Sequence, residues 1–121
     1  MTKKEKDKIL ETYTMEFSWS INSGRRIATC NGWLTQYIRD HYMISDADRL
    51  VNDVNGVLNG DYVLGGGATQ SLQYARITQT ETKIFKDIDE FMDDESIPPD
   101  FELPTDHFKV LVEAWRDFLS V

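Results

Sequence analysis

The sequence has very few of the residues that build crosslinks and metal sites. Cys30 is its only cysteine, and His41 and His107 are its only histidines in 121 residues. One cysteine cannot form an internal disulfide bond, so we expect a reducing compartment, the cytoplasm. No HxxxH or HExxH spacing occurs, which argues against a zinc site. The sequence therefore predicts no bound metal and no other cofactor.

Long apolar runs are also missing. No run approaches the roughly 18 residues of a membrane-spanning helix, so we expect no membrane partner. The charged start, Met1 to Lys8, is not followed by an apolar segment, so we expect no secretory signal. Hydrophobic residues still make up 40% of the chain, which excludes wholesale disorder. A chain of this length predicts one domain over residues 1–121.

Basic residues are scarce in one stretch only. The whole chain has 13 Lys and Arg against 21 Asp and Glu, a net charge of −8. Residues 87–106, here called the acidic ridge, contain nine acids and no base, and the remainder is close to neutral. Phosphate contacts need Lys and Arg, so direct nucleic-acid binding through the ridge is disfavoured. A basic protein partner is favoured, because a surface of one sign steers its opposite into encounter.

Apolar residues interleave with these acids, and Pro98-Pro99 stiffens the segment. A purely solvating tail would need neither, so we predict a partner-binding surface pinned to the body. Phe91 and Phe101 are candidate interface anchors, although they could equally be staples for a long connection. The predicted partner-binding residues are Asp87, Asp89, Glu90, Phe91, Asp93, Asp94, Glu95, Asp100, Phe101 and Glu102.

Periodicity predicts most of the secondary structure. Residues 1–10 are expected to contain a short, frayed helix. Residues 12–21 alternate strictly between apolar and polar, which predicts a strand, and 25–30 would return as the second strand of a hairpin. Helical spacing predicts helices over 33–43 and 46–59, with Ser45 as an N-terminal cap and Gly60 after the second helix.

The last third of the chain gives two strands and a helix. Residues 71–78 read as a strand, and Thr82 to Phe85 either form another strand or continue the first. Thr105 is expected to cap a final helix whose apolar stripe includes Trp115. Strands in hairpins predict an α+β fold, a single domain with an antiparallel sheet covered by helices.

Residues that could carry catalysis are few. Gly65-Gly66-Gly67 is expected to be a loop, but it lacks the lysine of a phosphate-binding P-loop and is not followed by a helix. A flexible hairpin connection explains it better, although a ligand-binding or partner-contacting loop stays open. Cys30 lies in an expected strand and has no nucleophile signature around it. We therefore expect no catalytic residues and no enzyme.

The C-terminal residues 97–119, IPPDFELPTDHFKVLVEAWRDFL, carry a family resemblance. An acidic, Pro-containing stretch followed by this helix resembles the end of small immunity proteins. Those proteins belong to bacterial polymorphic-toxin and contact-dependent inhibition systems. The resemblance implies a cytoplasmic partner of a cognate toxin domain, such as a nuclease whose active site it caps. It implies no individual site residues, so those named above rest on charge alone.

The leading functional hypothesis is therefore a non-catalytic immunity protein that neutralises a toxin through the acidic ridge. One alternative is a phage-type nucleic-acid mimic, which a distributed acidic surface would favour. Another is a small enzyme or ligand-binding domain that uses the Gly65–Gly67 loop. A subunit of a larger assembly would need a contiguous exposed apolar patch.

Overall fold

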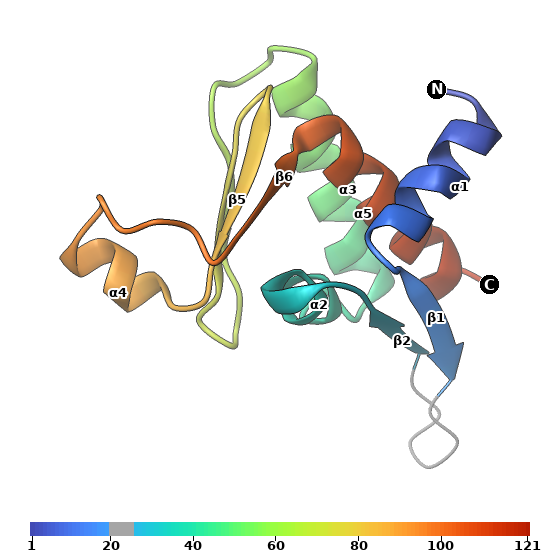
Figure 1. Ribbon diagram of the computed structural model, residues 1–121, viewed down its shortest axis with the longest axis horizontal. Coiled ribbons are helices and arrows are strands. Elements are labelled where there is room, and N and C mark those ends of the chain that lie inside the picture. The colour runs from blue at the N-terminus through green and yellow to red at the C-terminus, as the bar shows by residue number, and fades with distance from the viewer. Residues whose placement is uncertain (20–25) are drawn as a thin grey trace.

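The computed structural model describes residues 1–19 and 26–121, and for Trp19 its backbone alone. Its helices and strands are mixed along the chain, and Figure 1 shows their arrangement. In order they are α1 (Lys3–Thr12), β1 (Glu16–Trp19), β2 (Arg26–Thr29), α2 (Gly32–Arg39), α3 (Ile44–Leu58), β3 (Gly65–Ala68), β4 (Tyr74–Ile77), β5 (Glu81–Phe85), α4 (Ile88–Asp93), β6 (Phe101–Pro104) and α5 (Thr105–Leu119). The predicted α+β class is confirmed.

The larger sheet has four antiparallel strands in the order β3-β4-β5-β6, so each strand pairs with the next one along the chain. Because side chains alternate across a strand, the sheet has two distinct faces. Ala75, Ile77 and Ile84 are buried on one face. On the other face Arg76 lies opposite Lys83, which in turn lies opposite Glu102.

Helices cover the apolar face of this sheet. In Figure 1, α2, α3 and α5 lie on one side of the strands and α4 lies on the other. Phe108, Leu111 and Trp115 of α5 are buried together with Val54 and Val57 of α3. The expected sheet covered by helices is thus confirmed, and the predicted core position of Trp115 is correct.

A second, two-stranded sheet of β1 and β2 packs beside α5. The Phe17 ring stacks on the Phe118 ring with centroids 5.0 Å apart. The predicted hairpin partners are correct, since Phe17 pairs with Ala28. The expected turn and Arg25 lie outside the described residues.

The predicted strand over 12–21 is wrong at its start. Thr12 still belongs to α1, and the Tyr13 N–H bonds to the Ile9 carbonyl at 3.2 Å. Thr14 then adopts a φ of 50°, which no strand residue has. The alternating pattern overlapped a helical one, because Ile9, Leu10 and Tyr13 also share a face of α1 and pack on the core. The end of the expected strand, Ser20 and Ile21, lies outside the described residues.

The helix ends differ from expectation in two places. The predicted helix over 33–43 is instead α2, which ends at Arg39, and Met43 is already the N-cap of α3. Ser45 therefore lies inside α3 and is not its cap. Gly60 does follow α3 as expected, with φ +81°, and its N–H bonds to the Val57 carbonyl at 3.1 Å. This left-handed position is one that glycine adopts without strain.

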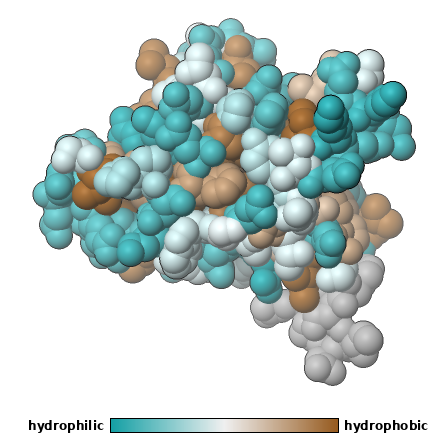
Figure 2. Space-filling model, viewed as in Figure 1, coloured by the Kyte–Doolittle hydropathy of each residue, from teal (hydrophilic) through white to brown (hydrophobic). Residues whose placement is uncertain are grey.

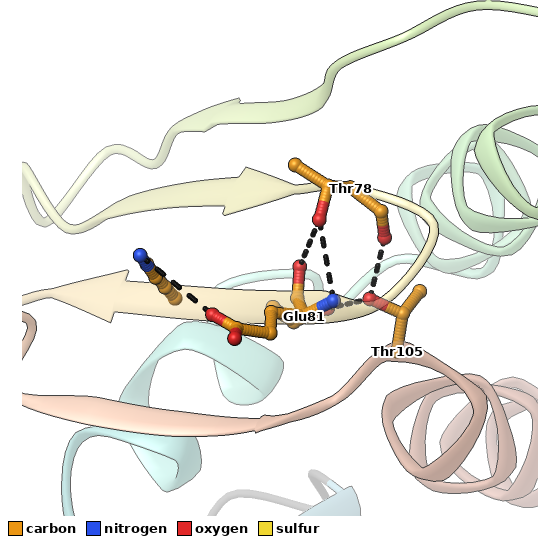
Figure 3. Close-up of polar contacts among 5 residues, drawn as sticks. Thr78, Glu81 and Thr105 are labelled. Carbon is orange, nitrogen blue, oxygen red and sulfur yellow. Dashed lines mark hydrogen bonds and ion pairs between the residues drawn. The ribbon is translucent and has the colours of Figure 1, made fainter.

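Thr105 does not cap α5 but locks its start to the sheet, as Figure 3 shows. Pro104 is the cap residue, and Thr105 is the first residue of α5 and fully buried. Its hydroxyl donates to the Thr78 carbonyl at 2.6 Å and lies 3.0 Å from the Thr82 hydroxyl. The Thr78 hydroxyl in turn accepts from the Glu81 N–H at 3.2 Å, which fixes the β4–β5 turn.

The expected Gly65–Gly67 loop is instead strand β3 at the edge of the sheet. Gly66 pairs with Arg76, and a Cβ on Gly66 would lie 2.2 Å from the Ala75 carbonyl oxygen. Glycine is therefore required by close backbone approach, at a φ of +98°. A strand without side chains has no hydrophobic alternation, which is why its sequence reads as a loop.

Candidate functional site

The acidic ridge folds into a helix, an extended connection, a strand and the start of α5. Helix α4 and residues 94–100 connect β5 to its neighbour β6. In Figure 1 this connection lies at the end of the molecule opposite α1 and the two chain termini. Figure 2 shows mostly hydrophilic residues over this end, with a small hydrophobic area among them. We call α4 and residues 94–100 the acidic arm.

Aromatic packing holds the acidic arm against the outer face of the sheet. The Phe91 ring lies 4.8 Å from the Phe85 ring and 5.0 Å from the Tyr74 ring, between centroids. The Arg76 guanidinium sits over the Phe91 ring at 5.2 Å and its Nη1 donates to the Tyr74 hydroxyl at 3.3 Å. The expectation that apolar residues pin the segment is confirmed for Phe91.

The aromatic residues of the ridge thus face inward. Phe91 is only 5% exposed, and Phe101 is half-buried with its ring 6.4 Å from that of Tyr13. Met92, by contrast, is 70% exposed on α4. Met92 is therefore better placed than Phe91 or Phe101 to contact a partner, although it is not among the predicted partner-binding residues.

Three of the predicted acids serve the arm's own backbone. Asp87 is the N-cap of α4 and accepts from the Asp89 N–H at 2.8 Å. Asp100 accepts from the Lys86 N–H at 2.8 Å. Asp94 accepts from the Ser96 hydroxyl at 2.6 Å and from its N–H at 3.0 Å, and these bonds lower the pKa of Asp94. These carboxylates have a structural role whatever else they do.

The other predicted acids are exposed and have no cation of their own. Within residues 1–19 and 26–121, the ion pairs join Lys3 to Asp7, Arg49 to Asp46, Lys83 to Glu81, and Arg116 to Asp48 and Asp117. None of these pairs includes an acid of the ridge. Asp89, Glu90 and Asp93 therefore present negative charge without a paired cation among the described residues. Glu95 and Glu102 lie nearer to bases, since Lys83 is opposite Glu102 in the sheet and lines one pocket with Arg76 and Glu95.

A second candidate site, this one concave, lies between α2, α3 and the edge strand β3. It is a pocket of about 580 Å³, which we call the tyrosine–aspartate groove. Gly66 and Gly67 form part of one wall. The lining also includes three tyrosines and three aspartates, namely Tyr37, Tyr42, Tyr62, Asp40, Asp46 and Asp53. The open alternative of a ligand-binding Gly65–Gly67 segment lies at this groove, but the sequence did not indicate its tyrosines and aspartates. The one available signal was the helical spacing of Asp46, Arg49 and Asp53 along α3.

Hydrogen bonds fix the walls of the groove. Asp53 Oδ2 accepts from the Gly66 N–H at 2.6 Å, which ties α3 to the free edge of β3. Asp40 Oδ1 accepts from Gln36 Nε2 at 2.8 Å and from the Ser71 hydroxyl at 3.1 Å. His41 lies at the end of the groove, and its Nδ1–H donates to the Tyr37 carbonyl at 2.8 Å.

Burial and charge set the protonation of the groove. Burial raises the pKa of Tyr37 well above its usual value, and the carboxylates of Asp53 and Asp40 raise it further. Burial lowers the pKa of His41, against the opposing effect of Asp40 and Asp46. At neutral pH the phenol is therefore protonated and the imidazole is uncharged.

The remaining sequence candidates do not assemble a reactive centre. Cys30 is half-buried beside the Thr35 hydroxyl, and burial raises the pKa of its thiol, which disfavours the thiolate nucleophile. His107 lies elsewhere, with Nδ1 2.8 Å from the Tyr13 hydroxyl. Among the described residues, no group of three or more His, Cys, Asp or Glu side chains could hold a metal ion.

The chain matches no protein-family model, no curated protein and no solved structure. No helix in the described part of the chain is long and apolar enough to span a membrane. The acidic arm and the tyrosine–aspartate groove must therefore be interpreted from their own geometry.

Proposed function

We propose that this chain is a non-catalytic binding protein that neutralises a basic partner through its acidic arm. The immunity-protein resemblance of residues 97–119 makes a cognate toxin domain, such as a nuclease, the preferred partner. The observation that carries the proposal is the exposed charge of α4, where Asp89, Glu90 and Asp93 form no ion pair with a described cation.

The mechanism follows from where these charges lie. Asp89, Glu90 and Asp93 are exposed on α4, at an end of the molecule away from the main helices. Carboxylates on a protruding element can enter a basic cleft and occupy the places of substrate phosphates. Long-range attraction would accelerate association, and burial of Met92 would slow dissociation.

Structural support within the arm suits this role. Phe91 and Arg76 hold α4 against the sheet before any partner arrives. A pre-ordered arm loses less conformational entropy on binding than a flexible acidic tail does.

The test is capture of partners from native cells by the tagged chain at about 50 mM and about 500 mM salt. We expect one stoichiometric partner with a basic domain, whose activity the purified chain then inhibits. The arm variant is Asp89→Lys, Asp93→Lys and Glu95→Lys, three carboxylates that accept no hydrogen bond in the described structure. We expect it to lose the partner at both salt concentrations and to lose inhibition.

The matched control is Glu11→Lys, Glu16→Lys and Asp61→Lys, which changes the net charge equally at exposed sites outside the ridge. It should retain the partner and the inhibition. Equal capture by both variants would contradict binding through the arm. Absence of any inhibited partner would contradict the proposed function itself.

A further inference from the structure

We propose that the tyrosine–aspartate groove binds an organic cation bearing N–H donors, an alkylammonium or guanidinium group. The pocket of about 580 Å³ falls within the range of about 300–1,000 Å³ that small-molecule sites occupy. All its lining residues lie between Tyr37 and Gln70, so none belongs to the acidic arm. The inference therefore goes beyond the proposed function and does not depend on it.

Charge selects the sign of the ligand. Among the described residues, Asp40, Asp46 and Asp53 line the groove together with one basic residue, Arg49. Arg49 lies 4.0 Å from Asp46 with its side chain 79% exposed, a geometry that neutralises little charge. Asp40 and Asp53 also raise the pKa of Tyr37, another lining residue, so both carboxylates act on the same side chain. A cation is favoured there.

Aromatic rings favour an organic cation over a metal ion. Tyr42 and Tyr62 line the groove with exposed side chains, and a ring face attracts an ammonium or guanidinium group. Tyr37 also lines the groove, but its side chain is buried. The carboxylates are also too dispersed for a metal, since the described residues contain no metal-binding group of three or more such side chains. The groove thus combines aromatic walls with separated negative charges.

Hydrogen-bond acceptors select a ligand that carries N–H groups. His41 donates through Nδ1 to a carbonyl, so Nε2 of its neutral ring is an acceptor. The carboxylates of the lining residues Asp40, Asp46 and Asp53 are further acceptors. A primary ammonium or guanidinium ion supplies several donors, whereas a quaternary ammonium supplies none.

Two sources can provide this chemistry, a free amine and a Lys or Arg side chain of a protein. Two separate titrations of the full chain distinguish them, one with agmatine and one with an acetyl-Gly-Arg-Gly-amide peptide. Binding is followed by the amide resonances of the ¹⁵N-labelled protein. We expect shifts at Asp53, Gly66 and Gly67 with at least one probe. Tighter agmatine binding would identify a free amine, and tighter peptide binding a protein side chain.

The decisive variant is Asp53→Asn, whose amide oxygen can still accept from the Gly66 N–H. We expect it to weaken binding about fivefold or more, because the charge is lost while the wall is kept. Asp93→Asn is the matched control, removing one charge from the acidic arm, and it should leave the affinity unchanged. Tetramethylammonium should bind more weakly than agmatine.

Three results would overturn the inference. The first is no shift in the groove with either probe at about 10 mM, a concentration that would detect even weak binding. The second is a set of shifts confined to α4, which would indicate non-specific attraction to the arm. The third is equal affinity of Asp53→Asn and the unmodified chain. None of these results bears on partner capture by the arm, so the two proposals fail separately.

Discussion

At the scale of single residues, the same chemical group serves different purposes within a short distance. Asp87, Asp94 and Asp100 are exposed or half-exposed carboxylates that cap backbone N–H groups. Asp89 and Asp93, close by in the chain, accept no hydrogen bond from a described residue. Net charge alone cannot separate these two kinds of acid, because the distinction is made by backbone geometry.

His41 couples the stability of the fold to pH. Burial lowers the pKa of His41 in the folded state, against the raising effect of the Asp40 and Asp46 carboxylates. The unfolded chain therefore binds a proton at a higher pH than the folded chain does. Stability is unaffected above the unfolded pKa of about 6.5 and is lost as the pH falls below it.

We expect a His41→Gln variant to show a smaller drop in melting temperature between about pH 7.5 and about pH 5.5 than the unmodified chain. The measurement is thermal unfolding followed by circular dichroism at several pH values. The variant loses the bond to the Tyr37 carbonyl, so only the pH dependence is compared, not the absolute melting temperature. Identical slopes in the two proteins would show that His41 protonation is not coupled to folding.

At the scale of elements, α3 and α5 were predictable and β3 was not. The two helices carry apolar stripes that pack against each other, so their sequences record their burial. Strand β3 consists of three glycines and an alanine, and only its pairing with β4 makes it a strand. Its structure depends on a neighbour, which no local pattern reveals.

The two candidate sites also differ in how much of each could be predicted from the sequence. The charge of the acidic ridge was visible as a run of acids, so its position was predictable. For Phe91 the sequence left two roles open, interface anchor or internal staple, because its partners Phe85 and Tyr74 come from other parts of the chain. The tyrosine–aspartate groove is assembled from α2, α3 and β3 and their connections. The sequence left only its Gly65–Gly67 wall open as a ligand site, because the other lining residues come together only in the fold.

The junction between the β4–β5 turn and α5 supports an element-scale prediction. Thr105→Val removes a buried hydroxyl and leaves the Thr78 carbonyl and the Thr82 hydroxyl without their partner. We expect a loss of about 1–3 kcal/mol in the free energy of unfolding. Urea denaturation measures it, and Thr105→Ser, which keeps the hydroxyl, should lose less. A Val variant as stable as the Ser variant would contradict this role.

At the scale of the whole molecule, charge is distributed unevenly along the chain. The helices and sheets outside the ridge carry almost balanced charge, whereas the ridge holds nine acids and no base. Like charges without partners repel one another in the folded state, and dissolved salt screens that repulsion. The ridge should therefore make stability depend on ionic strength.

We expect the melting temperature to rise when NaCl is increased from about 20 mM to about 300 mM, because the Debye length shortens. The Asp89→Asn, Asp93→Asn and Glu95→Gln variant should show a smaller rise, since it keeps the side-chain shapes and removes three charges. Differential scanning calorimetry of both proteins measures the difference. An equal rise in the melting temperature of the two proteins would show that the repulsion arises outside the acidic arm.

The arm joins two strands that are already hydrogen-bonded neighbours, since Ile84 of β5 pairs with Phe101 of β6. Its length and composition can therefore change without shifting the register of the sheet, provided that a residue like Phe91 still covers Phe85. Such a connection is free to diverge under selection while the domain that carries it is preserved. Under the proposed binding role, related chains could acquire different specificities by exchanging the acidic arm, residues 88–100, alone, and those residues would be the natural segment to graft when redesigning the protein.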